Sequence, residues 1–277
     1  MKKGTTISLK GFFILIALIL IFDFNASHAL AEFYVIAGSR GVGTEIKSLP
    51  YTISSAGFYY IKKDLSCAAG SNGITITADN ATLDLMGFSL IGPGGGLDYH
   101  GIYMSERSNV EIRNGTVTNF PQSGIYEDDA YGTGHRIIDI RARDNGDRGI
   151  YLLGKNHIIE RCSVIGNDNH GIQVSYGATI TGNTCYDNVN DGINASDGST
   201  INGNTCYDNN DNGISVGTGS TVIGNTSRDN DDYGISLGGD NLVDQNTATG
   251  NGLHKDISYC ASCTFGANHA PDPEPAP

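Results

Sequence analysis

Hydrophobic and polar positions recur along the second half of the chain at an interval of about 21 residues. A Gly-Ile pair opens each repeat, and successive pairs are separated by 28, 23, 25, 22, 21, 21 and 21 residues. The glycines are Gly73, Gly101, Gly124, Gly149, Gly171, Gly192, Gly213 and Gly234. Apolar and polar residues alternate after each pair, as in Ile172-Gln173-Val174. This alternation is the period of a β-strand and not of a helix.

Three further columns keep a fixed distance from the Gly-Ile pairs. Twelve residues before a pair stand Ile112, Ile137, Ile159, Ile180, Ile201 and Val222. Seven residues before stand Val117, Ala142, Val164, Cys185, Cys206 and Ser227, and four before stand Phe120, Asn145, Asn167, Asn188, Asn209 and Asn230. No single coil could bury such an apolar face alone, so the pattern predicts stacked coils of about three short strands, paired in parallel at ~4.8 Å. The asparagines are expected to pass hydrogen bonds from coil to coil.

Repeated Gly-Ile-x-apolar and Gly-Asn-Thr units resemble the right-handed parallel β-helix superfamily. The Gly-Asn-Thr units are Gly182-Asn183-Thr184, Gly203-Asn204-Thr205 and Gly224-Asn225-Thr226. The resemblance covers about residues 72–254 and implies an all-β, single-domain right-handed parallel β-helix, a solenoid of about 21-residue coils. The superfamily includes pectate-lyase-like polysaccharide enzymes, carbohydrate-binding proteins and periplasmic copper-site assembly proteins, so it predicts the fold and leaves the activity open.

Both ends of the chain depart from the repeat. Residues 1–31 combine a lysine leader, a 12-residue apolar run and a small-x-small pattern, which predicts a cleavable signal peptide and a secreted or periplasmic protein. An uncleaved anchor is the alternative, although ~20 residues are needed to span a bilayer. We expect residues 32–71 to form an N-terminal cap, residues 72–254 the β-helix, residues 255–269 a C-terminal cap and residues 270–277 a proline-rich tail.

The chain is acidic, with 17 Lys+Arg against 30 Asp+Glu and a formal net charge of -13. Such a surface repels nucleic acids and anionic membranes, because both require cations opposite phosphates. We therefore expect no nucleic-acid partner and no membrane span after removal of the signal. A metal cation, or a polysaccharide or cell-surface glycan that is neutral or bridged by calcium, is the more compatible partner.

One coil is about four residues longer than the regular repeat and carries the acidic sequence Glu127-Asp128-Asp129, followed by His135. Glu127 falls in a column that is otherwise apolar, where a carboxylate is costly unless the strand ends early or the group has a function. In an enzyme, two of these carboxylates would act as acid and base on a glycosidic bond. The four residues are candidate catalytic groups. The alternative is a solvated acidic bulge paired with Arg136.

Three tyrosines occupy one column on adjacent coils, at Tyr103, Tyr126 and Tyr151. Strand alternation points this column outward, so the rings are expected to form an exposed aromatic strip beside the long coil. Tyrosine offers sugars both an apolar ring face and a hydroxyl group. The strip is a candidate carbohydrate-binding site. The alternative is a cross-strand ladder that only stabilises the sheet.

A column of acids at Asp187, Asp208 and Asp229 raises the possibility of bound calcium, which takes carboxylate oxygens and would relieve repulsion between neighbouring coils. Solvated acids at turns are the alternative, and the sequence lacks the dense nonapeptide pattern of calcium β-rolls.

The chain has six cysteines. Cys260 and Cys263 are spaced for a local disulfide that locks the C-terminal end. A zinc site would need two further ligands. Cys185 and Cys206 fall in an interior column and are expected to act as small hydrophobic residues.

No cluster is evident among the histidines, and His100 and His170 are interpreted as turn residues. The catalytic motifs of polygalacturonases, pectate lyases and alginate epimerases are not apparent either. These observations favour a non-catalytic protein that binds carbohydrate on the solenoid face. A polysaccharide lyase or glycoside hydrolase that acts through Glu127-Asp128-Asp129 is the alternative. A periplasmic metal-delivery protein is a weaker one, because methionine is scarce.

Overall fold

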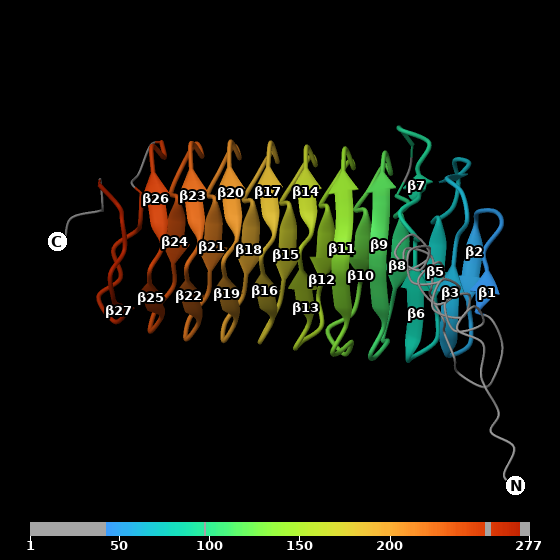
Figure 1. The fold of residues 1–277 in the computed structure, drawn as a ribbon, viewed down its shortest axis with the longest axis horizontal. Coiled ribbons are helices and arrows are strands. Elements are labelled where there is room, and N and C mark those ends of the chain that lie inside the picture. The colour runs from blue at the N-terminus through green and yellow to red at the C-terminus, as the bar shows by residue number, and fades with distance from the viewer. Residues whose placement is uncertain (1–42, 97, 253–255, 272–277) are drawn as a thin grey trace, which may run out of the picture. The chain divides into compact units, whose positions relative to one another are not determined.

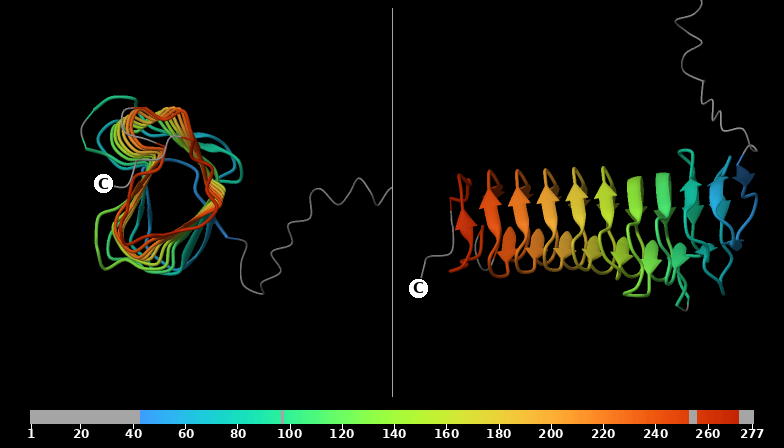
Figure 2. Two further views of the ribbon diagram at one scale, coloured as in Figure 1. Left: turned by 90° about the vertical axis from the view of Figure 1, so that its left-hand side faces the viewer. Right: turned by 90° about the horizontal axis from the view of Figure 1, so that it is seen from below.

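The described part of the chain is a stack of coils in which each short strand pairs in parallel with the equivalent strand of the next coil (Figure 1). The computed structural model describes residues 43–96, 98–252 and 256–271, which all belong to one compact unit. Seen along its axis, the coils of this unit superimpose (Figure 2, left). The predicted signal peptide lies outside the described residues.

One side of the stack is a nine-stranded sheet built from the residues that follow the Gly-Ile pairs. Its strands are β2 (Tyr51–Ile53), β5 (Ile74–Ile76), β8 (Ile102–Met104), β10 (Ile125–Glu127), β12 (Ile150–Leu152), β15 (Ile172–Val174), β18 (Ile193–Ala195), β21 (Ile214–Val216) and β24 (Ile235–Leu237). The leading isoleucines pair in register from β5 to β24 and are fully buried. Alternation within each strand therefore places one outward position between two inward ones.

The other two sides belong to an 18-stranded sheet in two rows. The first row holds β1 (Thr44–Glu45), β3 (Gly57–Tyr60), β6 (Ala81–Asp84), β9 (Glu111–Thr118), β11 (Arg136–Arg143), β13 (Ile158–Glu160), β16 (Thr179–Thr181), β19 (Thr200–Asn202), β22 (Thr221–Ile223), β25 (Leu242–Asp244) and β27 (Thr264–Phe265). The second row holds β4 (Leu65–Ser66), β7 (Ser89–Ile91), β14 (Ser163–Ile165), β17 (Thr184–Tyr186), β20 (Thr205–Tyr207), β23 (Thr226–Arg228) and β26 (Thr247–Thr249). Because β9 and β11 are eight residues long, they pair with both rows and join them. This architecture confirms the predicted all-β parallel β-helix.

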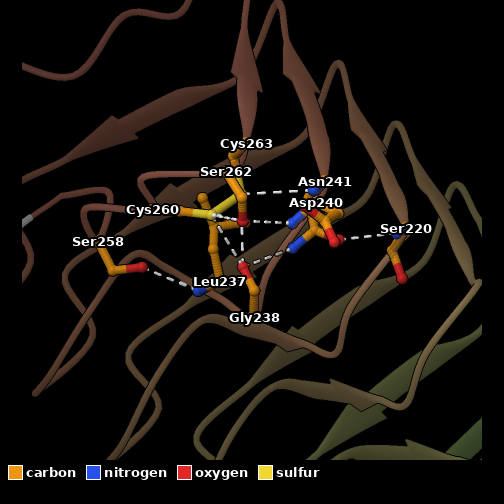
Figure 3. Close-up of a disulfide and its surroundings, with 9 residues drawn as sticks. All are labelled: Ser220, Leu237, Gly238, Asp240, Asn241, Ser258, Cys260, Ser262 and Cys263. Atoms are coloured by element: carbon orange, nitrogen blue, oxygen red, sulfur yellow. Dashed lines mark hydrogen bonds between the residues drawn. A yellow bond between two sulfur atoms is a disulfide. The ribbon is translucent and has the colours of Figure 1, made fainter.

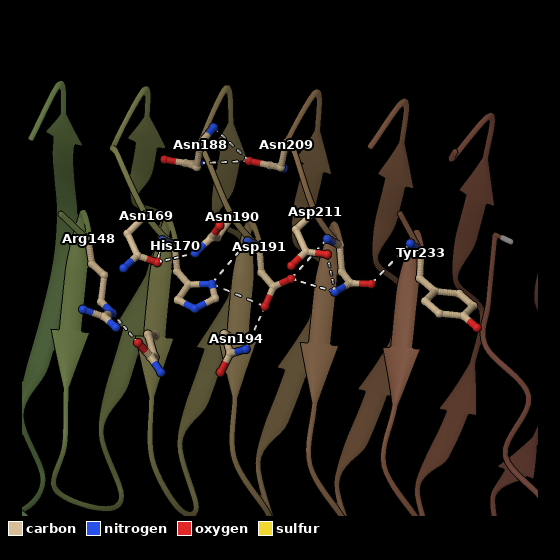
Figure 4. Close-up of polar contacts among 12 residues, drawn as sticks. Arg148, Asn169, His170, Asn188, Asn190, Asp191, Asn194, Asn209, Asp211 and Tyr233 are labelled. Carbon is tan, nitrogen blue, oxygen red and sulfur yellow. Dashed lines mark hydrogen bonds and ion pairs between the residues drawn. The ribbon is translucent and has the colours of Figure 1, made fainter. Parts of the chain in front are cut away.

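Asparagine ladders connect the coils at two corners. Asn188 donates from its backbone N–H and its side-chain amide to Oδ1 of Asn209, at 3.2 and 3.0 Å. Asn209 repeats the same contacts to Asn230 (Figure 4 shows the first step). A second ladder, which runs through Asn183 and Asn204, follows the same rule at the next corner. These bonds satisfy amides that are buried in the interior.

The solenoid extends beyond the Gly-Ile repeats at both ends. Strands β2, β3 and β4 already form a coil within the segment expected to be a cap, because Tyr51 takes the place of the leading isoleucine and pairs with Ile74. At the other end β27 pairs with β25, and Ile257 bridges to Ile235. The ends are thus incomplete or irregular coils. No helix among the described residues is long and apolar enough to cross a membrane.

Candidate functional site

An aromatic strip lies on the outer surface of the nine-stranded sheet and consists of Tyr103, Tyr126 and Tyr151. The three residues pair in register on β8, β10 and β12, and each is half-buried. The ring centroids of Tyr103 and Tyr126 are 6.0 Å apart, and those of Tyr126 and Tyr151 are 5.4 Å apart. The rings are therefore close enough to support one another and still offer part of their surface to a ligand.

Two polar residues extend the strip at its N-terminal end. The His100 ring stacks on Tyr126, with the centroids 4.2 Å apart, and burial lowers the pKa of His100 to about 4, so the imidazole is neutral near pH 7. The Tyr103 hydroxyl donates to Oδ2 of Asp128, while Oδ1 of the same carboxylate has no partner. Burial, aided by Asp128, raises the pKa of Tyr103 to about 12, so the phenol keeps its proton.

Arg148 lies at the opposite end of the strip. Its guanidinium carbon is 4.3 Å from the centroid of the Tyr151 ring, a cation–π contact. The same group forms an ion pair with Asp147 at 2.8 Å and donates to the side chain of Gln173. Cation and carboxylate thus alternate along the edge of the aromatic strip.

Glu127 lies inside the solenoid, with no exposed surface. Its Oε1 is 2.8 Å from Nε2 of His135, and its Oε2 accepts the backbone N–H of Gly154 at 2.9 Å. Nε2 of His157 is 3.1 Å from Oε2 but makes no hydrogen bond of good geometry. We call Glu127, His135 and His157 the interior cluster, since all three side chains are fully buried.

Glycines provide the room for the interior cluster. A Cβ atom on Gly132 would lie 1.5 Å from Oε1 of Glu127, and one on Gly154 would lie 2.8 Å from Nε2 of His157. Burial raises the pKa of Glu127, but the hydrogen bonds from His135 and His157 outweigh it and lower this pKa to about 2. The carboxylate is therefore ionised inside the protein.

This arrangement corrects the two interpretations of the acidic loop. Glu127 and His135 cannot contact a polymer on the outer surface, because both are fully enclosed. Arg136 does not balance the loop; it pairs with Glu111 at 2.7 Å. Of the predicted catalytic residues, Asp128 reaches the aromatic strip, whereas Asp129 accepts the backbone N–H of Tyr131 at 2.6 Å and shapes the turn.

The acidic column occupies exposed corners of the 18-stranded sheet. Asp187, Asp208 and Asp229 have φ angles of 55°, 53° and 54°, the left-handed conformation that aspartate tolerates better than most residues. Asp229 pairs with Arg228. Turn geometry thus accounts for the column, and calcium binding there stays a prediction.

A disulfide bond joins Cys260 to Cys263 (Figure 3). Both sulfur atoms lie near the carbonyl oxygen of Gly238, in the last full coil. Cys185 and Cys206 are free and fully buried. The bond therefore fastens the C-terminal turn, while the interior thiols pack as small apolar groups.

Sequence reasoning missed His157, His100 and Arg148. His135 and His157 each stand two residues before an isoleucine of the interior column, at Ile137 and Ile159. This common offset was the signal for the interior cluster, because equal offsets from one column bring residues to the same corner. His170 also has a partner, Asp191, at 3.3 Å (Figure 4).

Solved structures with a similar fold are carbohydrate-related proteins. The A-module of the mannuronan C-5 epimerase AlgE4 from Azotobacter vinelandii is 16% identical with a TM-score of 0.65, over 75% of this chain and 66%, just under two thirds, of that one. Pectate lyase Pel9A is 14% identical with a TM-score of 0.56, over 76% and 70% of the two chains. The periplasmic alginate epimerase AlgG is 14% identical with a TM-score of 0.55, over 77% and 70%. At these identities the likeness establishes the fold alone.

Comparison with curated protein sequences finds no match. A family model described as a right handed beta helix region matches residues 64–231 and residues 129–270. These overlapping matches span most of the chain and every strand from β5 to β27. The chain therefore belongs to the right-handed β-helix family.

Proposed function

We propose that this chain is an exported protein that binds a polysaccharide along the aromatic strip. The observation that carries the proposal is the row of half-buried tyrosine rings on adjacent coils, bordered by His100, Asp128 and Arg148. Tyrosine rings stack on the apolar faces of sugars, and flanking polar groups bind the hydroxyls. The resemblance to alginate epimerases and a pectate lyase supports a glycan as the partner.

The charges near the strip favour one class of glycan. Asp128 and Asp147 place carboxylates beside the rings, and Arg148 is already paired with Asp147. A free uronate polymer would be repelled by these acids, whereas a neutral glycan would use them as hydrogen-bond acceptors. We therefore expect neutral glycans to bind without additives, and alginate or pectin to bind only when calcium bridges the carboxylates.

Binding is tested by affinity electrophoresis and calorimetry with neutral glucans, alginate and pectin, each with and without calcium. Tyr126→Ala removes the central ring and is expected to weaken binding at least about tenfold, a change of about 1.4 kcal/mol. Tyr176→Ala is the matched control, since Tyr176 is 62% exposed and lies outside the strip. Equal affinities for the two variants would contradict the proposed site.

A second candidate is a polysaccharide-modifying enzyme, favoured by the contact between Asp128 and the Tyr103 hydroxyl. A half-buried acid–phenol pair beside a neutral His100 offers groups able to exchange protons with a bound sugar. The assay follows unsaturated uronates by ultraviolet absorbance and new reducing ends. Product that disappears in Asp128→Asn, but persists in Asp129→Asn, would identify the enzyme. Lack of product with glycan binding retained leaves the binding protein.

A further inference from the structure

We propose that the interior cluster of Glu127, His135 and His157 is a binding site for one divalent transition-metal ion, with zinc as the first candidate. One ligand atom from each residue lies within 4.8 Å of the other two. All three side chains are fully buried, so water competes little for the ion. The site is separate from the aromatic strip, which occupies the outer surface of the same coils.

Charge balance is the first argument. Nδ1 of His135 accepts the backbone N–H of Val110 at 3.1 Å, and Nδ1 of His157 accepts the backbone N–H of His135 at 3.1 Å. A histidine becomes a cation only when both ring nitrogens carry protons, so neither ring charges without losing its backbone bond. The Glu127 carboxylate thus lies in the interior without an imidazolium partner, and a lone buried charge is costly. A divalent cation at Nε2 and the carboxylate removes that cost.

The donor set is the second argument. Two imidazole nitrogens and one carboxylate oxygen are ligands that zinc and its neighbours in the first transition row accept. The backbone N–H groups at both Nδ1 atoms fix the rings with Nε2 toward the carboxylate, as outer-shell partners do in metal centres. Nε2 of His157 is fully buried and has no well-formed hydrogen bond, which leaves it free to coordinate.

The position of the cluster points to a structural ion. Glu127 ends strand β10, while His135 and His157 occupy the corners that precede β11 and β13. An ion bound to all three would link two successive coils and hold the long loop between β10 and β11 against the solenoid. Because the cluster is enclosed, the ion is expected to enter during folding and to remain until the coils open.

The test is to unfold the full chain in denaturant with chelator and to refold it with zinc, with cobalt or with chelator alone. Excess metal is then removed, and bound metal is measured by mass spectrometry. We expect about one zinc per chain and a melting temperature several degrees above that of the chelator-refolded protein. Cobalt is expected to give the visible absorption of a site with nitrogen and oxygen ligands.

Two variants separate the cluster from the acidic surface. Glu127→Gln preserves shape and removes the anionic ligand, so it is expected to retain less than about a tenth of the zinc. Glu111→Gln is the control, because Glu111 is a surface carboxylate paired with arginines. If Glu127→Gln does not fold, X-ray absorption of the refolded wild-type protein decides, with two nitrogen neighbours at about 2.0 Å expected. Wild-type protein that refolds equally well without metal and retains none, or equal zinc in both variants, would overturn the proposal.

Discussion

Removal of one rung from the asparagine ladder measures how much the ladder stabilises the fold. In Asn209→Ala, the side chain that is lost donates to the Cys185 carbonyl at 3.2 Å and to Oδ1 of Asn230 at 2.9 Å. It also accepts the backbone N–H and the side-chain amide of Asn188. The neighbouring Asn210 is exposed, which makes Asn210→Ala the matched control.

The magnitude follows from which groups lose their partners. The side-chain amide of Asn188 keeps the Val164 carbonyl at 3.1 Å, and Oδ1 of Asn230 keeps the backbone N–H of residue 209 at 3.1 Å. The backbone N–H of Asn188 loses its acceptor inside the protein, which costs about 1–3 kcal/mol. With the bond to Cys185 also lost, we expect Asn209→Ala to lower the free energy of unfolding by about 2–4 kcal/mol.

Equilibrium urea unfolding, followed by circular dichroism, gives the free energies of both variants under one set of conditions. Asn210→Ala is expected to stay within about 0.5 kcal/mol of the wild-type protein, as surface substitutions usually do. If Asn209→Ala and Asn210→Ala have the same midpoint and slope, the ladder contributes no more than any solvated asparagine, and the reasoning fails.

Three further predictions concern other parts of the solenoid. Gly132→Ala would place its Cβ 1.5 Å from Oε1 of Glu127 and should lower stability by about 2–4 kcal/mol in urea unfolding; a loss below about 0.5 kcal/mol would show that the cluster has room to spare. Burial lowers the pKa of His100 from 6.5 to about 4, so its stabilising contribution is complete above pH 6.5 and is lost as the pH falls toward 4; between pH 7 and pH 5 the wild-type protein should lose about 1–2 kcal/mol more than His100→Phe, and parallel stability curves would refute this. The four free cysteines are buried and should react with a thiol reagent only after denaturation, so rapid labelling of the native protein would contradict their interior position.

The repeat was predictable because it is a property of the backbone. Coils of equal length bring equal positions into one column, so the columns through Ile180 and Cys185 pair in the register that simple counting gives. The same alternation placed Glu127 among inward residues. The structure adds that an inward carboxylate has partners waiting for it.

The interior cluster was not predictable in the same way, because it depends on loops of unequal length. Residues 128–135 leave the repeat, form a longer excursion and return to the interior at His135. The stacking of His100 on Tyr126 likewise depends on a corner whose course the spacing does not define. Columns are thus readable from a single sequence, whereas contacts made by insertions require coordinates.

Four successive coils, which begin at Ile172, Ile193, Ile214 and Ile235, have the same length and the same ladder positions. They lie beyond the aromatic strip and before the disulfide-bonded end. Deletion or duplication of one such 21-residue module would keep every neighbour relationship on both sides. The height of the molecule is therefore adjustable by whole modules, as a spacer is, without redesign of the ligand-facing rows or of the terminal closure.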